Sequence, residues 1–328
     1  MPVTSITKDP EALTITVVAD FAATVERLWD AYVDPRQIER FWGPPDLPAQ
    51  FLRHDATTGG RSVYRLAVPD GEHVTCYWDW VSVDPHRSFE VRDGDPEGGT
   101  DDRPGRPGEG IDSMLFVFEA TATGSRLTTT TRFESAEGMA TMLRTGMEEG
   151  AEAAMGQIDG VLADLHSFAT EVPAHAQILG DTQVRVSRII RGTQQQVWRA
   201  HHEPALLQRW LLGPDGWTMP VCRVATTPGE SYRYEWEKGE ERFGFEGELL
   251  ESAAPYRSVT TERPIDLPVG LEGSVNELTL TPVDGGTLLT LLITYPSAEV
   301  RDMVLATGMT GGMETSYRRL ETQLLAPA

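Results

Sequence analysis

The chain repeats one pattern of residues about half-way along its 328 residues. The pair Leu28-Trp29 returns as Val197-Trp198, 169 residues later, and Ser135-Ala136-Glu137 returns as Ser297-Ala298-Glu299, 162 residues later. Solenoid repeats are only roughly 20–50 residues long, whereas units of about 150 residues have the usual size of an independent domain. The repeat therefore predicts two tandem domains with the same fold.

The two copies differ by one inserted segment. The spacing between equivalent motifs is 170 residues for Pro85 and Pro255, but it shrinks to 162 further on, so the first copy carries extra residues. The range 93–110 is rich in Gly, Pro, Asp and Glu, which predicts a mobile acidic loop with little apolar surface to bury. We expect domain 1 over residues 1–168, a linker over 169–181 and domain 2 over 182–328.

Each copy has the pattern of an α+β fold. Leu13, Ile15 and Val17 alternate with polar residues, as in a half-buried strand. Two short helices and five or six strands separated by turn residues follow, and these strands suit an antiparallel meander. A long amphipathic helix, capped by Ser135 or Ser297, closes the copy. We expect a curved antiparallel sheet wrapped around that long C-terminal helix.

The composition argues against several classes of protein. The 28 Lys and Arg residues face 50 Asp and Glu, a formal net charge of −22, which disfavours binding to nucleic acid or to anionic lipid. No apolar run approaches the ~18 residues of a membrane span, and the N-terminus lacks the pattern of a signal peptide. Two cysteines, Cys76 and Cys222, provide neither a disulfide framework nor a cysteine zinc site. These features predict a soluble, cytoplasmic protein.

Three motifs of the helical region occur in both copies. They are Leu28-Trp29, Asp34-Pro35 and Phe41-Trp42-Gly43-Pro44 in the first, and Val197-Trp198, Glu203-Pro204 and Trp210-Leu211-Leu212-Gly213-Pro214 in the second. With the order of elements, they resemble the START/Bet v 1-like (SRPBCC) superfamily, and within it the family named for the C-terminal domain of the activator of Hsp90 ATPase (AHSA1-type). The resemblance covers nearly the whole chain as two tandem helix-grip domains. The superfamily includes lipid carriers, hormone receptors and polyketide cyclases, so it indicates the fold more than the function.

The resemblance implies a cavity between the long helix and the sheet of each domain. Aromatic and methionine side chains of these elements are the candidate ligand-binding residues. They are Tyr64, Trp78, Trp80, Phe116, Phe118, Met147 and Met155 in the first copy, and Tyr232, Tyr234, Trp236, Phe243, Phe245, Met309, Met313 and Tyr317 in the second. The alternative is a filled core of the same side chains, because methionine fills irregular gaps as readily as it adapts to ligands.

Other conspicuous residues have ordinary structural explanations. Gly146 and Gly308 lie in the middle of the expected long helices, where glycine costs about 1 kcal/mol relative to alanine, and we interpret them as close packing. Glu246 alternates with glycine on a strand, and we expect it on the solvated outer face rather than in an acid–base role. The adjacent His201-His202 point in different directions and have no third ligand at metal spacing. No motif predicts a metal site, a cofactor or a catalytic residue.

Three functions are compatible with this sequence. The first is binding of a small, largely apolar molecule in one or both domains, without catalysis. The second is an aromatase/cyclase-like enzyme acting on a polyketide or a similar substrate, which a buried acid and base in one pocket would favour. The third is an interaction protein that contacts a chaperone or another protein, which filled interiors beside an exposed apolar patch would favour.

Overall fold

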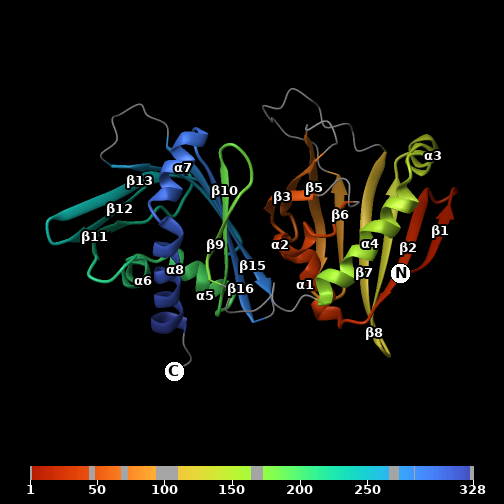
Figure 1. Cartoon of the computed structure of the whole chain (residues 1–328), viewed down its shortest axis with the longest axis horizontal. Coiled ribbons are helices and arrows are strands. Elements are labelled where there is room, and N and C mark those ends of the chain that lie inside the picture. Colours follow the sequence, from red (N-terminus) through yellow and green to blue (C-terminus); the bar gives the residue numbers. More distant parts are fainter. Residues whose placement is uncertain are drawn as a thin grey trace. The chain divides into compact units, whose positions relative to one another are not determined.

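The computed structural model describes residues 2–43, 49–67, 73–93, 110–163, 173–265, 273–283 and 285–325. The chain forms two compact units, Met1–Phe168 and Ala169–Ala328, here called domain 1 and domain 2 (Figure 1). Each contains an eight-stranded antiparallel sheet, two short helices and a helical segment at its end. This confirms the predicted α+β class of two tandem helix-grip domains. The predicted acidic loop, apart from its first and last residues, lies outside the described residues.

Domain 1 has the strand order β1-β2-β8-β7-β6-β5-β4-β3. Its elements are β1 (Val3–Asp9), β2 (Thr14–Phe21), α1 (Val25–Val33), α2 (Pro35–Ile38), β3 (Ala49–His54), β4 (Arg61–Ala67), β5 (His73–Asp84), β6 (Ser88–Asp93), β7 (Ile111–Thr121), β8 (Gly124–Phe133), α3 (Ala136–Arg144) and α4 (Met147–Ala163). Strands β3 to β8 form the predicted meander. The edge strand β1 has mostly exposed side chains, so its sequence has no alternating pattern to reveal it.

Domain 2 has the matching order β11-β12-β13-β14-β15-β16-β10-β9. Its elements are β9 (His175–Ile178), β10 (Gln183–Ile190), α5 (Gln194–His202), α6 (Pro204–Trp210), β11 (Thr218–Arg223), β12 (Ser231–Lys238), β13 (Glu241–Ala253), β14 (Arg257–Pro264), β15 (Ser274–Val283), β16 (Gly286–Thr294), α7 (Ala298–Ala306), α8 (Met309–Leu320) and a π-helical turn (Glu321–Leu325). Strand β9 pairs with β10 and lies within the range expected to be a linker.

Short polar side chains determine where the helices begin. The Thr24 hydroxyl accepts a hydrogen bond from the backbone N–H of Arg27 at the start of α1, and Thr193 and Gln196 cap α5 reciprocally. Ser135 and Ser297 cap α3 and α7, as the sequence predicted. The same local chemistry therefore starts equivalent helices in both domains.

The closing helix is broken in both domains. Gly146 has a φ of 88° and Gly308 a φ of 78°, the left-handed conformation that glycine adopts without steric cost. Gly146 separates α3 from α4, and Gly308 separates α7 from α8. The expectation of one continuous helix with a glycine in its middle is therefore wrong, because these glycines end one helix and precede the next.

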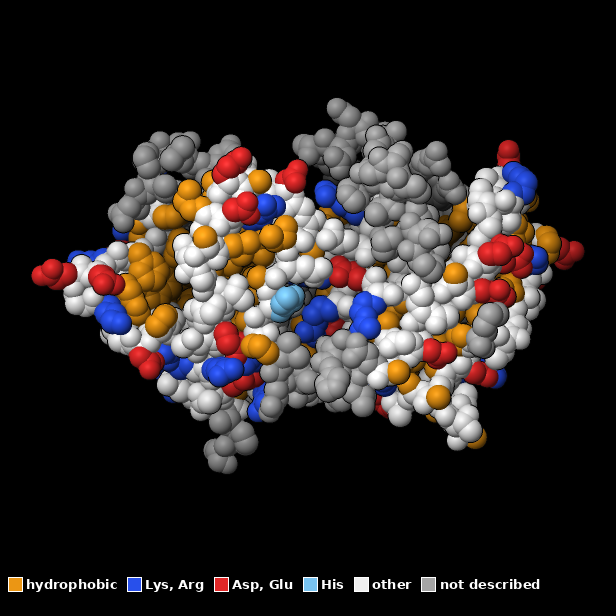
Figure 2. Space-filling model, viewed as in Figure 1, with side chains coloured by type: hydrophobic (Ala, Val, Ile, Leu, Met, Phe, Trp, Pro, Cys, Tyr) orange, Lys and Arg blue, Asp and Glu red, His pale blue; other side chains and the backbone are white. Residues whose placement is uncertain are grey.

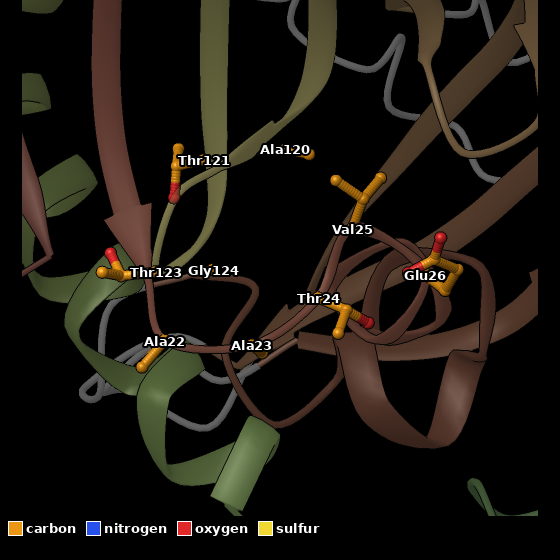
Figure 3. A pocket seen from close by; sticks show the side chains of 9 residues that line it. All are labelled: Ala22, Ala23, Thr24, Val25, Glu26, Ala120, Thr121, Thr123 and Gly124. Atoms are coloured by element: carbon orange, nitrogen blue, oxygen red, sulfur yellow. The ribbon is translucent and has the colours of Figure 1, made fainter.

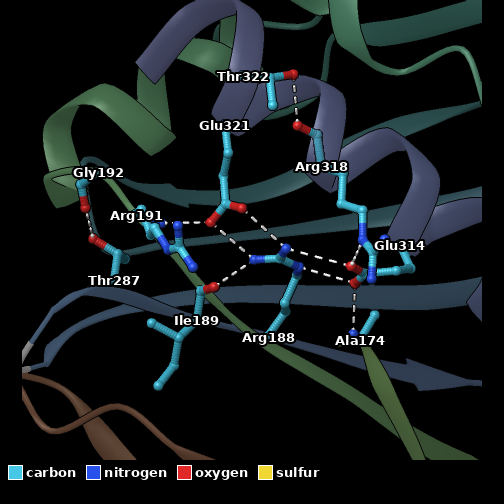
Figure 4. Close-up of polar contacts among 10 residues, drawn as sticks. All are labelled: Ala174, Arg188, Ile189, Arg191, Gly192, Thr287, Glu314, Arg318, Glu321 and Thr322. Atoms are coloured by element: carbon cyan, nitrogen blue, oxygen red, sulfur yellow. Dashed lines mark hydrogen bonds and ion pairs between the residues drawn. The ribbon is translucent and has the colours of Figure 1, made fainter. Parts of the chain in front are cut away.

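A buried arginine holds the closing helix of domain 2 to its sheet (Figure 4). Arg188 on β10 is 5% exposed and bonds both carboxylate oxygens of Glu314 and of Glu321, at 2.9 to 3.4 Å. Glu314 also accepts hydrogen bonds from the backbone N–H of Ala174 and from Arg318. Removing a partner of such a buried pair leaves an uncompensated charge, so this cluster fixes where α8 lies.

Candidate functional site

The candidate residues of domain 1 lie in a tightly packed core. Six of them are at most 7% exposed and belong to one continuous hydrophobic cluster, namely Tyr64, Trp78, Trp80, Phe116, Phe118 and Met155. Their rings touch one another and their neighbours, with Phe89 stacked on Phe116 at 4.4 Å between centroids and Trp78 edge-on to Trp42 at 4.5 Å. Met147 packs in a separate cluster with Ile15. Aromatic rings therefore fill the interior of domain 1 between its sheet and its helices.

Equivalent positions of the two sheets can be matched by their backbone hydrogen bonds. The N–H of Gly59 donates to the carbonyl of Trp80 at 2.8 Å, and the N–H of Gly229 donates to the carbonyl of Leu249 at 2.8 Å. Trp80 and Leu249 are therefore equivalent. Counting along the paired strands extends this match to further interior positions. It makes Arg87 equivalent to Tyr256, so the sequence match of Pro85 with Pro255 is one residue out of register. The interior pairs are Trp78 and Gly247, Phe89 and Ser258, Phe116 and Leu278, and Met114 and Asn276.

At each of these five positions domain 2 has the smaller or more polar side chain. Part of the difference is compensated, because the ring of Tyr232 lies across Gly247. A Cβ atom on Gly247 would collide with the carbonyl oxygen of Thr261 and come 2.8 Å from Cε1 of Tyr232. Leu249 and Ser258 are also buried, whereas Leu278 and Asn276 are half-buried where Phe116 and Met114 are buried. Domain 2 thus leaves interior side chains accessible to solvent.

The candidate residues of domain 2 form a partly open surface, which we call the aromatic face. It comprises the side chains of Tyr232, Tyr234, Trp236, Phe243 and Phe245, which alternate along the paired strands β12 and β13. Tyr232 and Trp236 are buried, Tyr234 and Phe245 are half-buried, and Phe243 is 42% exposed. Figure 2 shows hydrophobic side chains at the surface where helix α8 adjoins strands β11 to β13.

Helix α8 completes this region from the opposite side. Tyr317 is buried, and Met313 and Tyr234 both pack against its cluster. Met309 packs in the adjoining cluster with Tyr295, whose hydroxyl donates to the Met309 sulfur at 3.8 Å. Burial raises the pKa of Tyr295 to about 12, and the negative charge of Glu262 acts in the same direction. The predicted residues of this domain therefore come together, with Phe243 at the outer end, where it contacts Trp217 and Trp236.

Sequence reasoning missed a carboxyl group on the same face. Glu262 on β14 continues the aromatic face, because Phe245 pairs with Pro264 and strand alternation returns to this side two residues earlier. Burial raises the pKa of Glu262, while the polar side chains of Asn276 and Tyr232 act in the opposite direction. Burial also raises the pKa of Tyr232 and of Tyr234, and Glu262 adds to both shifts. The alternation of Thr260, Glu262 and Pro264 shows only that these three side chains share one face of a strand. It does not show which residues of the neighbouring strands lie beside Glu262.

The residues expected to be structural have structural partners. Glu246 lies on the other face of β13 and forms ion pairs with Arg233 and Arg263. The Nδ1–H of His201 donates a hydrogen bond to the carbonyl oxygen of Val197 at 2.8 Å, and burial lowers the pKa of His201 to about 4. Burial raises the pKa of the Cys222 thiol to about 11, which disfavours a reactive thiolate.

The described ranges contain no group of three or more His, Cys, Asp or Glu side chains that could hold a metal ion. No helix in the same ranges is both long and apolar enough to cross a membrane.

A separate pocket lies at one end of the sheet of domain 1 (Figure 3). It has a volume of about 450 Å³ and is lined by Ala22, Ala23, Thr24, Val25, Glu26, Ala120, Thr121, Thr123 and Gly124. Its one ionisable side chain is Glu26, whose pKa is lowered by hydrogen bonds at the start of α1. We base the candidate site on domain 2 instead, because the aromatic face combines large apolar side chains with a carboxyl group.

Comparison with known proteins identifies the family. The model of the activator of Hsp90 ATPase homolog 1-like protein family matches residues 22–163 and again residues 191–324. The chain belongs to this family. Each match begins after the first two strands of its sheet and covers the remaining strands and helices of that domain, which confirms the predicted tandem arrangement. No protein with a curated description matches the chain.

Solved structures similar to the chain are about half as long. A crystal structure of a Mycobacterium smegmatis protein is 39% identical and covers 50% of this chain and 100% of its own, with a TM-score of 0.44. A solution structure of an Arthrobacter aurescens protein is 36% identical and covers 53% of this chain and 99% of its own, with a TM-score of 0.45. An AHSA1-like protein from Aeromonas hydrophila is 20% identical and covers 42% of this chain and 92% of its own, with a TM-score of 0.37.

Proposed function

We propose that domain 2 binds a small, largely apolar molecule between its aromatic face and helix α8, and that domain 1 is a packed scaffold. One observation carries this proposal. Interior positions that hold buried rings in domain 1, such as Phe116, hold half-buried, smaller side chains in domain 2, such as Leu278. Covering accessible apolar surface is favourable by about 25 cal/mol per Å², so these side chains favour an apolar occupant.

The polar groups of this face do not support a proposal of catalysis. An acid and a base held together would favour a cyclase, whereas the described residues here offer one carboxyl group, Glu262, with phenols as its neighbours. The phenols have raised pKa values and therefore stay protonated at neutral pH. Binding is the function that these groups support best.

Fluorescence of N-phenyl-1-naphthylamine, a neutral apolar probe, tests the proposal on the full chain. The variant Leu278→Phe installs the residue that domain 1 has at the equivalent position, and we expect it to weaken probe binding at least ~10-fold. The matched control is Leu250→Phe, which adds the same ring at a position that is 41% exposed. Equal binding by the wild-type protein and both variants, or no binding by any, would overturn the proposal.

A further inference from the structure

Glu262 is the one carboxyl group in the interior-facing set of β12 to β15, among the residues that the structure describes. On strand β14 it lies opposite Gly247, between the rings of Tyr232 and Tyr234 on one side and Asn276 on the other. Glu262 is half-buried, and a carboxylate that is partly removed from water is stabilised by hydrogen-bond donors and by a positive charge.

The neighbouring side chains satisfy only part of its hydrogen-bonding capacity. The Tyr232 hydroxyl lies 2.8 Å from the carbonyl oxygen of Thr261 but 3.5 Å from Oε2 of Glu262. A phenol has a single proton, so the shorter contact takes it. Asn276 remains as a donor, since its Oδ1 already accepts from the Ser274 hydroxyl at 3.2 Å. An ionised carboxylate has about four acceptor positions, so room remains for another donor.

The nearby arginines are engaged on the opposite face of the sheet. Arg263 adjoins Glu262 in the sequence, but strand alternation directs it to the other side, where it pairs with Glu246. Arg233 pairs with Glu235 and with the same Glu246. Within the described part of the chain, Glu262 has no ion pair. The described residues therefore supply no positively charged partner for this carboxyl group.

The surroundings of Glu262 favour a cation. The faces of Tyr and Phe rings attract positive charge, and this attraction grows as water is excluded. Tyr232 and Tyr234 lie 5.0 Å apart between ring centroids, and Phe245 continues the same face. The net charge of −22 also raises the local concentration of small cations around the protein.

We propose that the ligand of domain 2 carries a protonated amine on an aromatic or apolar body, with the amine at Glu262 and the body over Tyr234 and Phe245. This rests on the proposed function and narrows it to one class of molecule. An ammonium group supplies both the missing donors and the missing positive charge. A neutral hydroxyl would supply only one donor, and a carboxylate would be repelled.

Three probes that share a phenyl ring but carry an ammonium, a hydroxyl or a carboxylate group test whether the site prefers an amine. They are 2-phenylethylamine, 2-phenylethanol and 3-phenylpropanoate, titrated calorimetrically into the full chain. We expect the amine to bind at least ~10-fold more tightly than the alcohol, which corresponds to one charge-assisted hydrogen bond, and the carboxylate to bind most weakly. In Glu262→Gln the amine and the alcohol should bind within about threefold of each other. Glu248→Gln removes the same charge from an exposed neighbour on β13 and should keep the wild-type preference.

The outcomes distinguish the two proposals. If N-phenyl-1-naphthylamine binds to the wild-type protein and to Glu262→Gln, but the amine shows no preference over the alcohol, the amine assignment is wrong and the binding function stands. A preference that persists in Glu262→Gln also overturns the assignment, because the selectivity then has another source. If neither the naphthylamine nor any phenyl probe binds, both proposals fail.

Discussion

The two domains have the same elements in the same order but different interiors. Domain 1 fills the space between sheet and helices with rings, including Trp78, Trp80 and Phe116. Domain 2 places Gly247, Leu249 and Leu278 at these positions, and its main hydrophobic cluster has fewer buried side chains than that of domain 1. The difference shows that the same fold accommodates smaller and more polar side chains at these interior positions.

The closing helices of the two domains are held to their sheets in different ways. Ala19 of domain 1 is equivalent to Arg188 of domain 2, because each pairs with the matching residue of the next strand, Leu127 or Leu289. Ala19 is fully buried among apolar side chains, whereas Arg188 reaches two glutamates of the closing helical segment. Hydrophobic packing thus positions α4, and buried ion pairs position α8. We call the ion pairs of Arg188 with Glu314 and Glu321 the ionic anchor; they hold α8 without covering the adjoining aromatic face.

A cavity-forming substitution in each domain tests most directly whether domain 1 is more tightly packed than domain 2. Trp78→Ala should lower the unfolding free energy of domain 1 by about 4 kcal/mol, because it removes a fully buried ring and leaves a cavity. Leu249→Ala in domain 2 is the matched change and should cost about 2 kcal/mol. Hydrogen exchange in urea, followed peptide by peptide, measures each domain in the intact chain. A loss below about 1 kcal/mol for Trp78→Ala would show that domain 1 is not tightly packed.

The ionic anchor of domain 2 gives the next largest effect. Arg188→Met should destabilise domain 2 by about 3 kcal/mol, because Glu314 and Glu321 lose their buried positive partner. Lys8→Met removes a cation of domain 1 from a 2.8 Å pair with Glu148 that is exposed, and it should cost at most about 1 kcal/mol. The same exchange experiment measures both variants. Equal small costs would mean that Arg188 does not anchor the helix.

Domain 2 should be the more acid-sensitive domain. Its His201 occupies the position of Tyr32 in domain 1, and burial lowers the His201 pKa to about 4. The unfolded chain, with an ordinary histidine pKa of about 6.5, binds more protons between these values, so the unfolding free energy falls as the pH drops through this window. We expect a loss of about 2 kcal/mol between pH 7 and pH 4 that His201→Asn removes. Urea unfolding at both pH values, compared between wild type and variant, measures it. An unchanged pH dependence in the variant would assign the acid sensitivity to other groups.

The helix break should be equally important in both domains. Gly146→Ala and Gly308→Ala should each cost about 1 kcal/mol, because alanine is strained at a positive φ. The added methyl group meets little else, with Glu149 Oε2 3.7 Å away at Gly146 and nothing within 4 Å at Gly308. The direction of the change in unfolding free energy distinguishes a broken helix from a continuous one, because in a continuous helix the same substitutions would stabilise the protein by about 1 kcal/mol. Thermal unfolding of both variants shows whether the melting temperature falls or rises.

The sequence predicted the fold in most of its detail. The repeat predicted two domains, and Ser135 and Ser297 predicted where helices begin; the structure confirms these elements. The alternation of Leu13, Ile15 and Val17 predicted a strand, which the structure confirms from Thr14 onward, while Leu13 lies just before it with a φ of 54°. The broken helix was missed because glycine is compatible with both a helix interior and a left-handed break. The edge strands β1 and β9 were missed because their pairing involves the backbone more than a buried face.

The candidate site was predictable only in part. Residue type indicated the aromatic face, since Tyr232, Tyr234 and Trp236 alternate along one strand. Nothing local distinguished it from the filled core of domain 1, whose tyrosine and tryptophan residues alternate in the same way. Glu262 was missed because its neighbours Tyr232 and Asn276 come from other strands, 30 residues before it and 14 after it.

By itself, then, the sequence determined two helix-grip domains, since local capping, alternation and a long repeat depend on residues close together in the chain. The tertiary structure alone decided which domain is packed and which is open. Packing depends on what lies opposite each side chain across neighbouring strands, and that register places Trp78 beside Ser62 but Gly247 beside Tyr232. The same register brings one carboxyl group to the aromatic face of domain 2.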